Sequence, residues 1–238
     1  MYLENVVFDA VEPQRLGRFW EAALGGARLT DEPAAFETRV CFDGVSALDL
    51  CFQRVAVPPV APPRLLLDLM VVGGARRGGE RLIGLGARRD TLRADSSALV
   101  LHDAEGNPCR VLDAPAPAAG PGSLAALRLQ SADPLRDADF WSWLSGWVAA
   151  PGDAPSSLRH RSLHGPVLEL TMEAEPKGET KNRLHLDVRL ETADDPDDVA
   201  SAIIGRGGRE LVAAGEGLPW RVYRDPSGNE FCVLPARS

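Results

Sequence analysis

The residues best suited to chemistry lie in the segment 183–191, where polar and apolar side chains alternate without a break. A two-residue period predicts a β-strand with one face packed on helices and the other face polar. His185 and Asp187 fall on the polar face, two residues apart. An imidazole and a carboxylate on one face can exchange protons or hold a metal ion together. This strand is therefore the first candidate for a functional site.

Three further segments of the second half also carry polar side chains on one face of an expected strand. These side chains are Arg128 and Gln130, Glu169 and Thr171, and Glu230 and Cys232. If the strands share one curved sheet with 183–191, the polar groups converge in a concavity, as a small-molecule site requires. The catalytic candidates are His185, Glu169 and Glu230. The ligand-binding candidates are Arg128, Gln130, Asp187, Trp220 and Cys232.

The same polar groups also have a structural interpretation. Arg128 lies on a strand expected beside Glu169 and Asp187 and would neutralise both in a buried ion-pair network. His160 and His164 flank an expected hairpin, where histidines are usually solvated. The acidic run at 195–198 begins an expected helix, whose dipole favours negative charge, so no metal site is predicted there.

The two halves of the chain repeat each other. Pro13, Phe19 and Trp20 recur as Pro134, Phe140 and Trp141, a spacing of 121 residues, and Asp103, Gly106 and Asn107 recur as Asp225, Gly228 and Asn229. Each half is predicted to run strand, helix and three strands, twice over. The prediction is an α+β fold of four βαβββ modules, paired into two domains at 1–113 and 123–238, each a curved mixed sheet with helices on its outer face. The segment 114–122 (APAPAAGPG) is the expected linker.

Composition excludes several classes of function. With 34 acidic and 26 basic residues the net charge is −8, which disfavours nucleic-acid and anionic-membrane partners. The first ten residues already alternate like a strand, and no apolar stretch is long enough to span a membrane, so we expect a cytoplasmic protein. The four cysteines form no CxxC pair, which disfavours a zinc knuckle. The segments IGLGAR and IGRGGR follow expected helices and are predicted to end them, unlike a dinucleotide fingerprint.

Two motifs resemble a known family. Residues 181–187 read KNRLHLD and residues 225–234 read DPSGNEFCVL, with weaker copies RLLLD at 64–68 and DAEGNPCRVL at 103–112. The chain resembles the vicinal oxygen chelate (VOC) superfamily of glyoxalases, extradiol dioxygenases and bleomycin-resistance proteins, in its glyoxalase-like subgroup. The resemblance covers nearly the whole chain outside the linker and implies the tandem two-domain form.

The resemblance also implies where metal ligands would lie. In the second half these positions hold Ala126, Glu169, His185 and Cys232, and in the first half Asn5, Asp49, Leu66 and Arg110. Leucine and arginine make a metal in the first half improbable, so the first domain is expected to be degenerate and the second to bear the site. The metal set, if one exists, would be Glu169, His185 and Cys232.

Three functions stay open at this point. The first is a metal-free protein without a cofactor that binds or sequesters a small polar or aromatic molecule, as the bleomycin-resistance members of the family do. The alternative is a metal-dependent lyase, isomerase or dioxygenase that uses Glu169 and His185 with one divalent metal in the second domain. The third is metal-free acid–base catalysis by His185, Asp187 and Glu230. The chain is expected to act as a monomer or homodimer.

Overall fold

The computed structural model describes residues 1–71, 73–90, 99–113, 123–212 and 218–237. The expected linker, 114–122, lies outside the described residues. Among the helices of the described ranges, none is long and apolar enough to cross a membrane.

Four modules follow one another along the chain, each with the predicted order of a strand, a helix and three strands. The first comprises β1 (Tyr2–Ala10), α1 (Pro13–Leu24), β2 (Ala27–Asp31), β3 (Ala35–Phe42) and β4 (Ser46–Arg54). The second comprises β5 (Leu65–Val71), α2 (Ala75–Gly84), β6 (Arg88–Arg89), β7 (Leu99–His102) and β8 (Pro108–Asp113). The third comprises β9 (Ser123–Ser131), α3 (Pro134–Ser145), β10 (Val148–Ala149), β11 (Ser156–Arg159) and β12 (Val167–Met172). The fourth comprises β13 (Leu184–Arg189), α4 (Pro196–Gly205), β14 (Arg209–Val212), β15 (Arg221–Arg224) and β16 (Glu230–Leu234).

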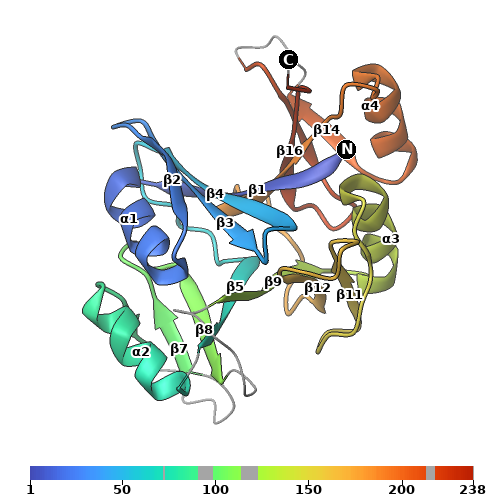
Figure 1. Cartoon of the computed structure of the whole chain (residues 1–238). Helices are drawn as coiled ribbons and strands as arrows, with labels where there is room; N and C mark the ends of the chain where they lie inside the picture. Colours follow the sequence, from blue (N-terminus) through green and yellow to red (C-terminus); the bar gives the residue numbers. More distant parts are fainter. Residues whose placement is uncertain (72, 91–98, 114–122, 213–217, 238) are drawn as a thin grey trace.

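The modules pair across the two halves of the sequence. Sheet A has the strand order β14-β15-β16-β13-β1-β4-β3-β2 and joins the first module to the fourth. Sheet B has the order β10-β11-β12-β9-β5-β8-β7-β6 and joins the second module to the third. In Figure 1 the blue strand β1 accordingly belongs to one sheet with the red strand β16. The α+β fold with two mixed sheets is confirmed, but the prediction that each half forms its own sheet is wrong.

The seam of each sheet, where the first strands of two modules pair, allows modules from different halves of the sequence to share a sheet. The first strands of two modules pair antiparallel, β1 with β13 and β5 with β9. The last strand of each module runs parallel to its first strand. Because all four modules begin with a strand of the same type, backbone hydrogen bonds alone do not identify the partner of each first strand. The repeat in the sequence therefore fixes the modules without fixing their partners.

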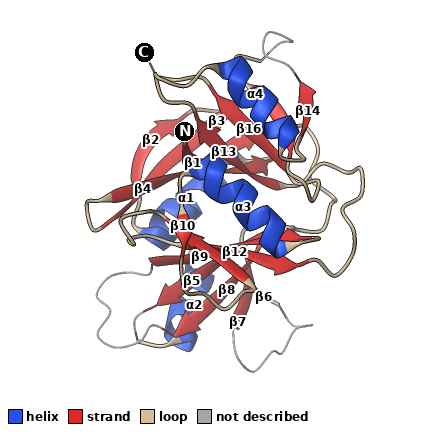
Figure 2. Cartoon of the chain, turned by 90° about the vertical axis from the view of Figure 1, so that its right-hand side faces the viewer, coloured by secondary structure: helices blue, strands red, loops and turns tan. Residues whose placement is uncertain are grey.

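Alternation along the strands divides the side chains between two faces. In β13, Leu184, Leu186 and Val188 join the apolar core, which leaves His185 and Asp187 on the other face. The helices pack on the apolar faces, α1 on β3 and β4 and α3 on β11 and β12. Helix α3 also contacts β1, and Figure 2 shows it between the strands of the two sheets.

Three helices begin, and two end, where the sequence predicts. Helices α1, α3 and α4 each begin at the expected proline. The side chains of Asp133 and Asp195 accept hydrogen bonds from first-turn backbone N–H groups of α3 and α4, as N-caps do. Gly86 and Gly207 follow α2 and α4 with φ of 115° and 91°, which confirms that the glycine-rich segments terminate helices.

Candidate functional site

The polar residues expected to share one site are divided between the two sheets. Arg128 and Gln130 on β9 and Glu169 on β12 belong to sheet B. The remaining strand residues of the set, His185, Asp187, Glu230 and Cys232, belong to sheet A. The expected single site on the second half is therefore not formed, because each half contributes strands to both sheets. In particular, Glu169 and His185 are not brought together as ligands of one metal.

An ion-pair network covers the polar face of sheet B. Arg110 donates from Nε to Asp68 Oδ1 at 2.7 Å and also from Nη2 to Oδ2. Arg128 donates from Nη1 to Glu169, and the same atom lies 3.9 Å from Asp68. Glu169 also accepts from the backbone N–H of Asp153 at 3.0 Å. Both buried carboxylates are neutralised by protein cations. The expected pair of Arg128 with Glu169 is present, but the expected neutralisation of Asp187 by Arg128 is wrong, because Asp187 lies in sheet A and Asp68 takes its place.

A cavity of about 570 Å³ opens over sheet B beside this network. Its walls are largely apolar. Apolar wall residues include Pro62, Pro63, Leu66, Val100, Pro108 and Pro176, and polar ones include Arg64, Asp90, His102, Arg110, Gln130 and Glu175. A concave, mostly apolar cavity with a few convergent polar groups is the usual form of a small-molecule site.

The polar face of sheet A contains a cluster of three titratable side chains. Ligand-type atoms of His185, Asp187 and Cys232 lie within 4.8 Å of one another, and all three residues are buried. Asn5 donates to Asp187 Oδ2 at 3.1 Å, and His185 Nε2 lies 3.5 Å from Asp187 Oδ1. In the described part of the chain, His185 Nδ1 and Asp187 Oδ1 have no hydrogen-bond partner.

Burial controls the protonation of this cluster. Desolvation lowers the pKa of His185 to about 3, so its imidazole is neutral at physiological pH. Desolvation raises the pKa of Asp187 to about 7 and also raises the pKa of the Cys232 thiol, which the nearby Asp187 carboxylate raises further. A neutral imidazole is the form that binds a metal ion.

The strand registers show that Asp187 and Asp68 occupy equivalent positions in the two sheets. Asp187 pairs with Asn5 on one side and Cys232 on the other, as Asp68 pairs with Ala126 and Arg110. The arginine that neutralises Asp68 is thus replaced by Cys232 beside Asp187. Two residues earlier on the strand, His185 replaces Leu66. The buried carboxylate of sheet A consequently lacks the cation that its equivalent has in sheet B.

A glyoxalase-like domain model matches residues 5–112 and 126–234, which is most of the chain in two copies. The chain belongs to the glyoxalase-like domain family. Glyoxalase I from Zea mays has a similar structure, with a TM-score of 0.66 at 16% identity, and the match covers 98% of this chain and 92% of that one. A putative dioxygenase from Bacillus subtilis matches with a TM-score of 0.61 at 14% identity, over 100% of this chain and 86% of that one. At these identities the similarity establishes the tandem VOC fold alone. No curated protein sequence matches the chain.

The metal-ligand positions that the glyoxalase-like family implies are grouped by sheet and not by half of the sequence. Sheet A combines Asn5 and Asp49 with His185 and Cys232, and sheet B combines Leu66, Arg110, Ala126 and Glu169. In sheet A, Asp49 accepts from Arg39 Nε and Nη2 at 2.8 and 2.7 Å and is therefore occupied. Asp187, which lies outside these positions, takes its place beside His185 and Cys232.

Two other predicted site residues have different surroundings. Glu230 is buried and accepts from Lys177 and Arg224, each at 3.2 Å, and from the backbone N–H of Asn182 at 3.1 Å. It belongs to a closed ion-pair cluster, which argues against a role as a free acid or base. Trp220 is half-buried just before β15 and does not line the cavity of sheet B.

One important residue, Asp68, was absent from the candidates drawn from the sequence. The sequence does contain a pattern that marks Asp68, because RLLLD at 64–68 and RLHLD at 183–187 end in the same residue. The aspartate common to both motifs marks the central carboxylate of each sheet, and only the residues around it differ.

Proposed function

We propose that this protein binds a planar small molecule in the cavity of sheet B without a metal ion. The observation that carries the proposal is the cavity itself, whose wall includes Arg110, the arginine that neutralises the buried Asp68. A metal bound by Asp68 or Glu169 would have to displace Arg110 or Arg128 from a buried acid, whereas an organic ligand in the cavity needs only to cover the apolar walls.

The walls indicate the class of ligand. Leu66 and Val100 provide apolar surface. The charge of Arg64 is neutralised by Glu173, because Arg64 Nη2 donates to Glu173 Oε2 at 2.6 Å. Glu175 lines the cavity and is exposed; Arg64 donates to its backbone carbonyl at 3.4 Å, and its carboxylate forms no ion pair with a described residue. A rim with an unneutralised carboxylate favours a neutral or cationic molecule over an anion.

Binding of proflavine, a planar cationic dye, tests this proposal through its fluorescence. Leu66→Trp fills the cavity, and we expect it to weaken saturable dye binding at least about tenfold. Leu135→Trp adds the same ring at an exposed position of α3 and should leave the affinity unchanged. Equal affinities of the wild type and Leu66→Trp would place the dye elsewhere and refute the proposal.

A second candidate function, metal binding in sheet A, is favoured by the cluster of His185, Asp187 and Cys232. The donors fit a zinc ion, because imidazole nitrogen, carboxylate oxygen and thiolate sulfur are its usual protein ligands. The buried atoms without hydrogen-bond partners in the described structure, His185 Nδ1 and Asp187 Oδ1, support the fit. A bound zinc ion would supply Lewis-acid chemistry. The residues themselves would position it, with Asn5 orienting Asp187 through its hydrogen bond.

Zinc content measured after purification without chelators or a metal-affinity tag tests this candidate. The expectation is about one zinc per chain in the wild type and loss of the metal in Cys232→Ser. Cys41→Ser alters an exposed cysteine and serves as the matched control. Zinc-free protein whose melting temperature does not respond to added zinc would refute the metal site while leaving the proposal for sheet B intact.

A further inference from the structure

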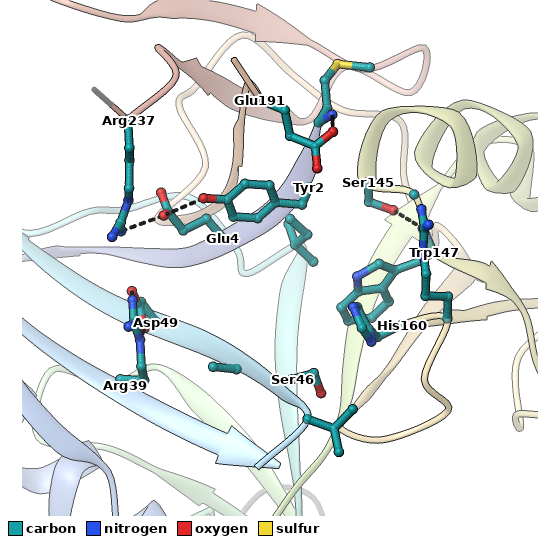
Figure 3. A pocket seen from close by; sticks show the side chains of 16 residues that line it. Tyr2, Glu4, Arg39, Ser46, Asp49, Ser145, Trp147, His160, Glu191 and Arg237 are labelled. Carbon is teal, nitrogen blue, oxygen red and sulfur yellow. Dashed lines mark hydrogen bonds and ion pairs between the residues drawn. The ribbon is translucent and has the colours of Figure 1, made fainter. Parts of the chain in front are cut away.

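A second cavity, about 550 Å³ in volume, lies between one end of sheet A and the third module. We call it the cleft. Sheet A contributes Tyr2, Glu4, Arg39 and Asp49, the third module contributes Ser145, Trp147, His160 and Arg161, and Glu191 and Arg237 complete the wall. Figure 3 shows the sheet A residues and Trp147 with His160 on opposite sides of the cleft. It is separate from the cavity of sheet B, with which it shares no lining residue.

The carboxylates that line the cleft are already paired with cations. Asp49 binds Arg39, and Glu4 accepts from Arg237 at 2.7 Å. Glu191 accepts from the amino group of Met1 at 3.1 Å, and the same amino group lies 2.8 Å from Asp194. Glu4 also accepts from Nε of Arg189. No acid of the lining is left to attract a cationic ligand.

The opposite wall presents hydrogen-bond donors that lack acceptors among the described residues. Arg161 lines the cleft with its side chain exposed, and no described residue forms a hydrogen bond or ion pair with it. Counting Arg189 and Asp194, which pair with lining groups, the cleft has five cations (the Met1 amino group and four arginines) and four carboxylates, so Arg161 is the cation in excess. An unpaired guanidinium at the mouth of a cavity is a binding group for a carboxylate.

His160 adds a second donor. The backbone N–H of Ser162 donates to His160 Nδ1 at 3.2 Å, so Nδ1 is the acceptor nitrogen of the ring. The neutral imidazole then carries its proton on Nε2, which has no partner in the described structure. Burial, and next the charge of Arg161, lower the pKa of His160, which keeps the ring neutral.

Trp147 provides the third donor. Its backbone is engaged by Ser142 and Ser145, but its indole N–H has no acceptor among the described residues. Trp147 and His160 both line the cleft, and Figure 3 shows both rings on the same wall. Donors on three side chains that line the cleft, each without an acceptor among the described residues, favour a group that only accepts hydrogen bonds.

We propose that the cleft binds the carboxylate of a small planar acid, which Arg161, His160 and Trp147 hold through their free donors. One excess positive charge matches a monoanion better than a dianion. The volume exceeds what an inorganic ion needs, and the half-exposed ring of Tyr2 and the exposed Val45 offer apolar surface for the rest of the molecule. This ligand is distinct from the neutral or cationic molecule proposed for sheet B.

Isothermal titration with naphthoate tests the proposal, with the uncharged naphthamide as the matched ligand. We expect saturable binding of naphthoate, a loss of about tenfold in affinity in Arg161→Gln, and no measurable binding of naphthamide. In nuclear magnetic resonance spectra, the indole N–H signal of Trp147 should shift with naphthoate. Arg15→Gln alters an exposed arginine on α1 and should bind naphthoate like the wild type.

Four outcomes would overturn the proposal. These are equal binding of naphthamide, unchanged affinity in a folded Arg161→Gln, tighter binding of naphthyl phosphate than of naphthoate, and no binding of naphthoate at millimolar concentration. Because Arg161 is exposed and has no partner among the described residues, its variant should keep the melting temperature of the wild type, so that folding and binding are separable. Leu66→Trp should not affect naphthoate binding, which separates a failure here from a failure of the site in sheet B.

Discussion

Arg110 neutralises Asp68 on sheet B, with 2.7 Å between Nε and Oδ1, at the position where sheet A has Cys232 beside Asp187. Each sheet of the duplicated fold thus has one buried aspartate at this position, and of the two only Asp68 forms an ion pair with an arginine. In sheet B the arginine of the pair lines a cavity, while in sheet A the carboxylate lies next to His185 and a thiol. The two polar faces have therefore diverged in chemistry without diverging in topology.

The first prediction follows from that ion pair. Arg110→Ala leaves Asp68 buried with only Arg128, 3.9 Å away, to balance its charge, and should lower the free energy of unfolding by about 3 kcal/mol. Chemical denaturation measures the change. Arg76→Ala removes an exposed pair with Glu80 and should cost less than about 0.5 kcal/mol. If both variants lose the same small amount, the network contributes nothing special to stability.

A second prediction concerns the indole of Trp20, which donates to the buried Asp103 at 3.0 Å and ties α1 to the turn before β8. Trp20→Phe removes the donor and leaves a small void, and it should destabilise the protein by about 2–4 kcal/mol. Trp141→Phe should behave alike, because Trp141 donates to Asp225 at 3.2 Å. Trp143→Phe is the control, since Trp143 is only partly buried. Thermal unfolding that ranks Trp143→Phe with the other two would contradict this account.

The third prediction tests the packing of α1 on sheet A. A Cβ atom at Gly17 would lie 2.1 Å from Cδ1 of Phe36, which is itself fully buried. Gly17→Ala should therefore destabilise by about 1–3 kcal/mol despite the better helix propensity of alanine. At Gly205, in α4, nothing lies within 4 Å of the added atom, and the same substitution should be neutral or stabilising by up to about 1 kcal/mol. Denaturant midpoints that move in the same direction for both would argue against the close contact of α1 with β3.

The fourth prediction is the titration of His160. Burial and the charge of Arg161 both disfavour the imidazolium, so the midpoint of its ring signals in magnetic resonance should fall below the model-peptide pKa of 6.5. Arg161→Gln removes one of the two causes and should move the midpoint upward, while Arg15→Gln should leave it in place. A downward or absent response to Arg161→Gln would mean that the guanidinium does not face the ring.

The sequence predicted individual strands and helices better than it predicted which modules share a sheet. The alternation at 183–191 placed His185 and Asp187 on a polar face correctly, and the prolines located three helix starts. The partner of each module could not be inferred, because pairing depends on backbone hydrogen bonds that any of the first strands can make. The observed pairing places Glu169 and His185 in different sheets. It also brings Asn5 to Asp187, which is 182 residues away in the sequence.

The exchange of modules leads to a last prediction, about the halves of the chain. Residues 123–238 alone contain β9 and β13 but neither of their antiparallel partners, β5 and β1. Each seam would then expose an unpaired strand edge together with the apolar residues that its partner covers, such as Leu127 and Leu186. We expect this half to be unfolded, aggregated or dimeric when it is expressed alone. Co-expression with residues 1–113 should give a one-to-one complex of the two fragments with a cooperative unfolding transition, because every strand then has its partner. Size-exclusion chromatography and circular dichroism distinguish these states. A folded monomer of 123–238 would mean that the half can close a sheet by itself, and that the observed pairing is one of two arrangements open to this chain.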